Sequence, residues 1–425
     1  MPQKGNVLVR MGKMPFLSAS PVETLQKNLT LSNTGNLLFQ HAFIRSIYQP
    51  QLNIFPMQDG PYTVQDIEKI NANFDAVYLT FANAFRTTFR GALKNWAAVI
   101  KKIDIPVVIV GVGAQCASDN PAAELAEINA DVRALCDAVL EKSVSIGVRG
   151  EFTANYLNDL GVKNVDVIGC PSMFYFGAAL PVPSTMDFSN IRKIAFHFSP
   201  QSPDNFGERN PDADAQLEAM VQFMLHKENM GCTYIAQDTQ ELQQRVWGIK
   251  GVTLAHYAPL LANVATLYPL DPNVWIKDLQ KFDIALGTRI HGSIAAVLAG
   301  IPSFILCHDS RTAELANWFG LPRIDKAYIQ QQALTPDLLC KIMEDREMHK
   351  VFPDRFLRYT DFLRKNNIPF ALQNDSGLNP HWEQYDKDIE SAGLPPSLDH
   401  DQNNPQLINE KINYVYRLLM QKNKA

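Results

Sequence analysis

The residues with the clearest chemical character run from Thr288 to Gly292, in the order Thr-Arg-Ile-His-Gly. They follow the candidate strand 283–287 and precede a short helix of small residues, so we expect a turn between a strand and a helix start. The first N–H groups of a helix and its dipole favour negative charge. Arg289 adds a permanently charged donor that can grip phosphate or carboxylate at two points. His291 can give or take a proton near neutral pH.

A purely structural interpretation of this turn is also open. Arg289 then bonds to a neighbouring carbonyl group, and His291 is a hydrogen-bonded histidine of the core. Under the functional interpretation, Gly292 lets a ligand approach the backbone closely, and Ser293, which opens the helix 293–299, is a further substrate-binding candidate. The local pattern favours neither interpretation.

A second polar cluster follows the candidate strand 303–306. It reads His-Asp-Ser-Arg over residues 308–311, with a glutamate at the start of the next helix. Ligands of parallel sheets bind at the carboxyl ends of the strands, so we count as substrate-binding candidates Asp309, Ser310, Arg311 and Glu314. Helix capping explains the same residues, with Asp309 or Ser310 as N-cap. The two roles are compatible.

The first half of the chain supplies further candidates. Arg149 ends the candidate strand 144–148 and can bring a second positive charge to a cleft from its opposite side. A salt bridge from Arg149 to Glu151 or Asp166 is the alternative. Two polar, glycine-containing loops are candidate substrate contacts, or simply turns and helix caps, through Gly35, Asn36, Gly113 and Gln115.

Several common sites are missing from the sequence. It contains no Walker A loop, GxGxxG fingerprint, HExxH, EF-hand loop or GxSxG. Its six cysteines are scattered, without a CxxC pair. We therefore expect neither a metal nor a cofactor, and interpret the cysteines as small buried residues of a reducing compartment.

The elements that must position these residues follow an alternating pattern. Short apolar runs alternate with amphipathic stretches of helix length, such as 122–140 and 213–230, which predicts an α/β fold with doubly wound parallel sheets. The run 106–112 is apolar on both faces, as a buried parallel strand requires. Candidate strands lie at 6–10, 75–81, 106–112, 144–148, 165–168, 194–199, 233–237, 284–287 and 303–306.

The stretch 180–190, which contains Pro and Ser, is the candidate linker between two such units. We predict an N-terminal Rossmann-like domain over 1–185 and a C-terminal one over 190–370, which contains the turn 288–292. A tail over 371–425 completes the chain. It is expected to hold a long polar surface loop, 370–406, and a last packing helix, 406–421.

Length and composition restrict the class of protein. A chain of 425 residues is long enough for two domains. Its 39 Lys and Arg against 44 Asp and Glu give a net charge of −5, which argues against a globally basic nucleic-acid binder. We find neither a signal peptide nor an apolar run of about 18 residues. We therefore expect a cytoplasmic protein, with peripheral contact at the inner face of the membrane left open.

Residues 288–315, TRIHGSIAAVLAGIPSFILCHDSRTAEL, resemble the polysaccharide pyruvyl transferase family. An R-x-H-G turn, a small-residue helix ending in G-x-P and a later D-x-[KR] are that family's signature. Residues 145–174 are similar to its strand–Arg–helix segment, in which an aspartate commonly follows the arginine and another opens the later loop. Here Gly150 and Cys170 stand at those two places.

The resemblance implies a glycosyltransferase-B-like arrangement of two Rossmann-like domains. It also implies transfer of a pyruvyl group from phosphoenolpyruvate to a sugar of a cell-surface polysaccharide or its precursor, forming a pyruvate ketal. The donor's carboxylate and phosphate require at least two cationic partners, for which Arg149 and Arg289 are the candidates, and His291 is the candidate proton-transfer group. The partners would be this donor and a carbohydrate acceptor, lipid-linked or free, and no nucleic acid.

Two alternatives remain at this point. A nucleotide-sugar glycosyltransferase on the same fold would also use Arg289 and the helix start at Gly292. An inactive sugar-binding or assembly protein of a polysaccharide locus belongs to a different class, and turnover of phosphoenolpyruvate would distinguish it.

Overall fold

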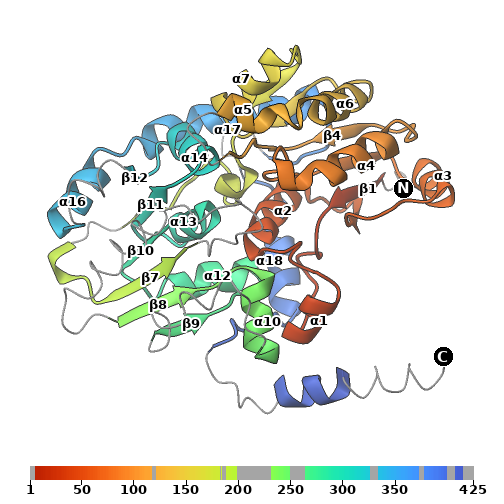
Figure 1. Ribbon diagram of the computed structural model, residues 1–425. Helices are drawn as coiled ribbons and strands as arrows, with labels where there is room; N and C mark the ends of the chain where they lie inside the picture. Colours follow the sequence, from red (N-terminus) through yellow and green to blue (C-terminus); the bar gives the residue numbers. More distant parts are fainter. Residues whose placement is uncertain are drawn as a thin grey trace.

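The computed structural model describes residues 5–116, 121–181, 183, 188–198, 231–248, 264–325, 334–372, 378–399 and 407–414. Within these residues the chain forms two parallel sheets that lie side by side, each covered by helices (Figure 1). The loop 200–211 and the helix 213–230 expected from the sequence lie outside the described residues, as does part of the predicted linker 180–190.

The first sheet has the strand order β2-β1-β3-β4, all parallel. A parallel bridge between Val112 and Val148 extends it to the pair β5-β6. The strands are β1 (Gly5–Arg10), β2 (Leu52–Met57), β3 (Ala76–Leu79), β4 (Val107–Ile109), β5 (Ile146–Val148) and β6 (Val165–Val167).

Alternation along these strands explains why both faces of the first sheet are covered. Val9 and Tyr78 pack on the side of helix α2 (Thr34–Ile47). Leu8 and Val77 point to the opposite side. There they pack with the apolar stripes of α4 (Arg90–Ile100) and α6 (Asn129–Leu140). Successive residues of a strand face opposite sides, so a run such as 106–112 must be apolar throughout.

The second sheet has the order β12-β11-β10-β7-β8-β9, again all parallel. Numbered within the unit, this is the 3-2-1-4-5-6 order of a Rossmann sheet. The predicted α/β class with two Rossmann-like units is therefore confirmed. The strands are β7 (Lys193–His197), β8 (Gly231–Ile235), β9 (Ala265–Leu267), β10 (Ile284–Gly287), β11 (Ser303–Cys307) and β12 (Arg323–Asp325).

Every strand expected from the sequence is present, and three further strands were not predicted. These three, β2, β9 and β12, are edge strands. The predicted helix 122–140 is interrupted, and forms α5 (Pro121–Ala126) and α6. Of the predicted last helix, residues 407–414 are helical, and the remainder lies outside the described residues.

After the second sheet the chain returns to the first unit. Helix α17 (Met348–Lys365) crosses from one unit to the other (Figure 1). Tyr359 of this helix stacks on Phe174, with ring centroids 4.9 Å apart. Beyond its end, Asn366 accepts the backbone N–H groups of Val144 and Ser145, each at 3.1 Å. Helix α17 therefore covers part of the first unit's core.

The predicted surface loop 370–406 is wrong in its middle part, which forms helix α18 (Trp382–Ser391). The helix packs on α2: the Arg45 guanidinium lies 4.5 Å from the Trp382 ring centroid and bonds to Asp386 at 3.0 Å. Trp382 and Tyr385, three residues apart, are its only buried side chains. So narrow an apolar edge in a polar sequence does not produce a visible helical stripe.

Candidate active site

The start of helix α13 (Ile290–Leu298) lies where the carboxyl ends of β7 and β10 meet. Its N-cap residue, Arg289, makes no side-chain capping bond. The two flanking glycines make room for His197: a Cβ on Gly287 would lie 1.8 Å from the His197 carbonyl oxygen, and one on Gly292 would lie 2.6 Å from its ring. Packing against His197 therefore requires a glycine at position 292.

Arg289 is buried, and its charge is already compensated. Its Nε donates to the Phe198 carbonyl at 2.5 Å. One terminal nitrogen bonds to the Asp238 carboxylate and lies 3.3 Å from Glu241 Oε2. Burial alone would lower the pKa of Arg289, but the two carboxylates outweigh it and raise the pKa above its ordinary value. In this structure Arg289 therefore has the structural role considered above, because it bonds to a neighbouring carbonyl group.

His291 lies at the contact between the two units. A Cβ on Gly35, at the start of α2, would be 2.8 Å from the His291 Nδ1. The other ring nitrogen, Nε2, is 3.6 Å from the Cys170 sulfur. Burial, together with the positive charges of Arg149 and Arg311, holds the pKa of His291 well below its ordinary value. The imidazole is therefore neutral at pH 7 in the free protein.

Arg149 follows β5 and is only 1% exposed. Its Nε donates to the Gly111 carbonyl at 3.1 Å, and one terminal nitrogen is 3.9 Å from the Cys170 sulfur. Its guanidinium lies 5.4 Å from the Phe39 ring centroid. Gly113 makes room for this side chain, because a Cβ there would be 3.0 Å from Arg149 Cδ.

No carboxylate of the described residues forms a salt bridge with Arg149. The proposed partner Asp166 is instead held by Lys365 at 2.9 Å. The other, Glu151, is exposed at the start of α7 (Glu151–Asp159). Burial lowers the pKa of Arg149. The nearby carboxyl group of Glu314 offsets this only in part. A buried cation without a directly bonded counter-ion is costly, so this guanidinium is suited to an anionic ligand.

Asp309 and Ser310 attach the second unit to the loop after β4. Asp309 caps α14 (Ser310–Phe319) by accepting the Thr312 N–H at 2.8 Å, so the capping interpretation is confirmed. Its other oxygen accepts the Gln115 side-chain amide at 3.3 Å. The Ser310 hydroxyl accepts the Cys116 N–H at 3.1 Å. Gln115 therefore contributes to the contact between the units.

Two predicted substrate contacts carry buried polar atoms that have no hydrogen-bond partner in the described part of the chain. They are Arg311 Nε and the Ser293 hydroxyl. Arg311 also lies 3.3 Å from Asp309. Polar atoms left without partners on burial cost free energy unless a ligand or water satisfies them.

Glu314 reaches across to the first unit and caps α7. Its two oxygens accept the Thr153 backbone N–H at 2.7 Å and the Thr153 hydroxyl at 3.0 Å. A Cβ on Gly150, the residue before α7, would lie 2.3 Å from Glu314 Cγ. No larger side chain fits at position 150 while Glu314 keeps this place. Burial raises the pKa of Glu314 to about 7.

The structure thus brings His291, Arg149 and Gly35 together, with Arg311 close enough to affect the pKa of His291. The side-chain amide of Asn36, another predicted substrate contact, donates to the Leu31 carbonyl at 2.7 Å.

Sequence reasoning missed His197 as a neighbour of the site, and it named Cys170 only as the residue that stands where the family commonly has an aspartate. Both follow strands, Cys170 after β6 and His197 at the end of β7. Their position at strand ends is the feature of the sequence that could have identified both residues.

No group of three or more His, Cys, Asp or Glu side chains among the described residues is arranged to hold a metal ion. All six cysteines are free thiols. Within the described ranges, none of the helices has the length and apolar character needed to cross a bilayer.

Residues 33–310 match the family model described as polysaccharide pyruvyl transferase. No curated protein matches the chain. Among solved structures, the UDP complex of S. aureus MnaA aligns with 93% of this chain and 100% of its own, at 11% identity and a TM-score of 0.43. The Methanocaldococcus jannaschii UDP-GlcNAc 2-epimerase, in complex with UDP-GlcNAc and UDP, aligns with 85% of this chain and 99% of its own, at 11% identity and a TM-score of 0.44. The Streptomyces nogalater glycosyltransferase SnogD aligns with 92% and 100%, at 11% identity and a TM-score of 0.33.

Proposed function

The chain belongs to the polysaccharide pyruvyl transferase family and is therefore a transferase, and on this premise we propose that it moves a pyruvyl group from phosphoenolpyruvate to a sugar of a cell-surface polysaccharide or its precursor. The observation that carries the proposed donor is Arg149, which is buried without a carboxylate partner among the described residues and lies beside the neutral His291. An anionic donor would supply the missing counter-charge.

The donor's two anionic groups would lie between Arg149 and the uncapped start of α13. Arg311 contributes positive charge from the opposite unit. Helix starts and guanidinium groups are the usual partners of phosphate and carboxylate. Arg289, which the sequence analysis placed here, would instead hold the turn in position through Asp238 and Glu241.

In the proposed reaction His291, protonated when the anionic donor binds, gives its proton to the terminal enol carbon of the donor, which becomes a methyl group. The neighbouring carbon becomes oxocarbenium-like, and one sugar hydroxyl attacks it and loses its proton. Phosphate then leaves with the electrons of the C–O bond, and a second hydroxyl closes the cyclic ketal and loses its proton. The neutral His291 would then take the proton of the attacking hydroxyl and pass it to the leaving phosphate. The proton of the second hydroxyl would return His291 to its starting state.

The test is a calorimetric titration with phosphoenolpyruvate, compared with a panel of nucleotide sugars. We expect binding of phosphoenolpyruvate alone. The variant Arg149→Met should lose about 2–4 kcal/mol of binding free energy, since charge-assisted bonds are removed. The matched control is Arg133→Met, because Arg133 is a half-exposed arginine of α6. Parental donor affinity in Arg149→Met, or binding of nucleotide sugars only, would overturn the proposal.

A further inference from the structure

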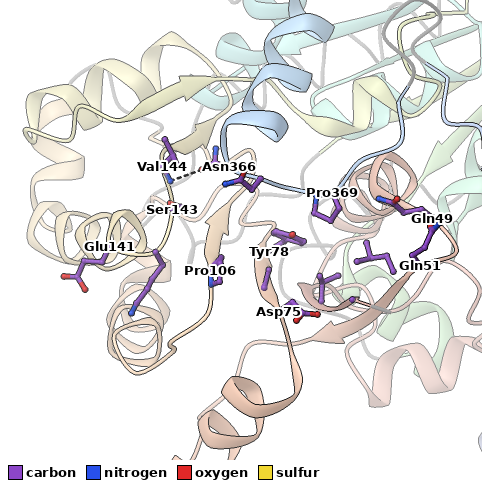
Figure 2. A pocket seen from close by; sticks show the side chains of 16 residues that line it. Gln49, Gln51, Asp75, Tyr78, Pro106, Glu141, Ser143, Val144, Asn366 and Pro369 are labelled. Atoms are coloured by element: carbon purple, nitrogen blue, oxygen red, sulfur yellow. Dashed lines mark hydrogen bonds between the residues drawn. The ribbon is translucent and has the colours of Figure 1, made fainter. Parts of the chain in front are cut away.

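A cavity of about 620 Å³ lies at the end of the first sheet opposite to Arg149 (Figure 2). It opens at the amino ends of β1 and β3 and at the residues that follow α17. Because β1 is six residues long, this end is about 20 Å from the carboxyl end. The cavity is therefore separate from the candidate active site. Its lining includes Gln49, Gln51, Asp75, Tyr78, Glu141 and Lys142.

The cavity wall carries a hydroxyl group that forms no hydrogen bond to any other described residue. Tyr78 is 2% exposed, lines the cavity, and its phenol makes no hydrogen bond within the described part of the chain. Figure 2 shows Tyr78 in the middle of the lining, between Pro106 and Pro369. Burial and the nearby Asp75 raise the pKa of Tyr78, which keeps the phenol neutral and able to donate.

The rim supplies further hydrogen-bonding groups. The side-chain amides of Gln49 and Gln51 line the cavity and bond to none of the described residues. Both precede β2 (Leu52–Met57), and β1 lies between that strand and β3, which carries Tyr78. Each amide offers both donors and an acceptor. Together with the phenol, they can bind a ligand that carries several hydroxyl groups.

The charged and apolar side chains of the cavity restrict the class of ligand that it can bind. Asp75 and Glu141 line the cavity against a single basic side chain, Lys142. This balance disfavours phosphates, nucleotides and other polyanions. The remaining wall is apolar and includes Leu52 and Val144, the latter 48% exposed. Such walls pack against the C–H faces of a sugar ring while amides and hydroxyls bind its edge.

We propose that this cavity binds a neutral oligosaccharide segment of the acceptor polymer, remote from the site of transfer. That the ligand is part of the acceptor rests on the proposed function. Holding the polymer at a second point raises the local concentration of its reactive sugar near His291. The site would then affect polymeric acceptors and leave single sugars unaffected.

The test uses the full-length double variant Tyr78→Phe/Gln51→Ala. The matched control is Gln65→Ala, an exposed glutamine of α3 (Val64–Asn73) outside the cavity. The probes are an array of neutral oligosaccharides of two to six sugars, with uronic-acid oligosaccharides and nucleoside phosphates beside them. Thermal melts check that all proteins are equally folded.

We expect the parent and Gln65→Ala to retain neutral oligosaccharides, and the double variant to lose at least 80% of that signal, an effect on the order expected for two lost polar contacts. With an oligosaccharide acceptor the variant's KM should rise and its kcat should not change. With the terminal monosaccharide neither should change. Retention of acidic probes only, of no probe, or equal retention by the variant would overturn the proposal. Phosphoenolpyruvate titration of the parent tests the proposed function separately: a parent that retains neutral oligosaccharides but does not bind phosphoenolpyruvate would overturn the proposed function and not the oligosaccharide site. The double variant should bind phosphoenolpyruvate as the parent does.

Discussion

Gly35 of the first unit lies against His291 of the second so closely that a Cβ atom on Gly35 would be 2.8 Å from both the Cβ and the Nδ1 of the histidine. The absence of a side chain at position 35 therefore determines where the imidazole lies. The orientation of the candidate proton-transfer group depends on the contact between the starts of α2 and α13.

The variant Gly35→Ala should consequently displace His291 and reduce turnover. Small misplacements of a reacting group cost about 10²-fold in rate, and we expect a loss of this order in phosphate release. Gly91→Ala is the control, because Gly91 is also helical and a Cβ there meets nothing within 4 Å. Parental turnover in Gly35→Ala would show that the position of His291 is not rate-determining.

Replacing His291 by glutamine should affect turnover and spare donor binding. General acid–base catalysis contributes about 10²–10⁴-fold, whereas Arg149 and the start of α13 remain to hold the anion. Phosphate release, donor titration and thermal melts measure the three properties, with the exposed His349→Gln as control. A lower melting temperature with parental turnover per folded molecule would make His291 structural. Lost donor binding at unchanged stability would make it a phosphate ligand.

Donor binding should be accompanied by proton uptake at His291. In the free enzyme, burial and the charges of Arg149 and Arg311 hold the pKa of this histidine well below its ordinary value. A bound anion compensates those charges and raises the pKa, so donor affinity should increase as the pH falls. Calorimetry in buffers of different ionisation enthalpy measures the uptake, and the difference between the parent and His291→Gln isolates this residue. Equal uptake by both proteins would contradict the prediction.

Stability should fall with rising pH through the titration of Glu314. Burial raises the pKa of this carboxyl group from the ordinary 4.5 to about 7. The folded protein therefore binds the proton more tightly, and the associated stability is present below pH 4.5 and lost as the pH rises through 7. The shift corresponds to about 3 kcal/mol. Glu314→Gln should flatten the pH dependence of the melting temperature in this window, whereas the exposed Glu68→Gln should not.

The two arginines predicted to bind the donor should differ in their effect on stability. Arg289→Met leaves the buried Glu241 without its counter-ion and should destabilise the protein by about 3–5 kcal/mol. Arg149→Met removes a buried cation that has no carboxylate partner within the described residues, so the melting temperature should stay equal or rise. Denaturant unfolding of both variants gives the comparison. Equal destabilisation would show that Arg149 has a structural counter-ion in solution.

The features of the fold that could be predicted are those encoded by a short, continuous run of residues. Buried strands are continuous apolar runs, which is why the central strands were predicted. The edge strands β2, β9 and β12 are only partly covered, and Phe55 of β2 is 42% exposed, so their patterns resemble those of loops.

The same distinction applies to the site. Arg149 and His291 were predicted because each follows a strand, which is a local property. The partners of Arg289 were not, because Asp238 is 51 residues away in the sequence. The fit between Gly150 and Glu314 depends on residues 164 positions apart, and no local pattern encodes such a pair.

Because α17 and α18 return to the first unit, the polypeptide cannot be cut between the two sheets into two independent domains. A single break in the polypeptide between the two sheets would leave these helices covalently joined to the C-terminal fragment. They would still pack on the N-terminal fragment, through Tyr359 on Phe174 and Trp382 beside Arg45. A gene split at such a point would therefore encode two polypeptides that need each other to cover their apolar surfaces, and that co-elute as a heterodimer.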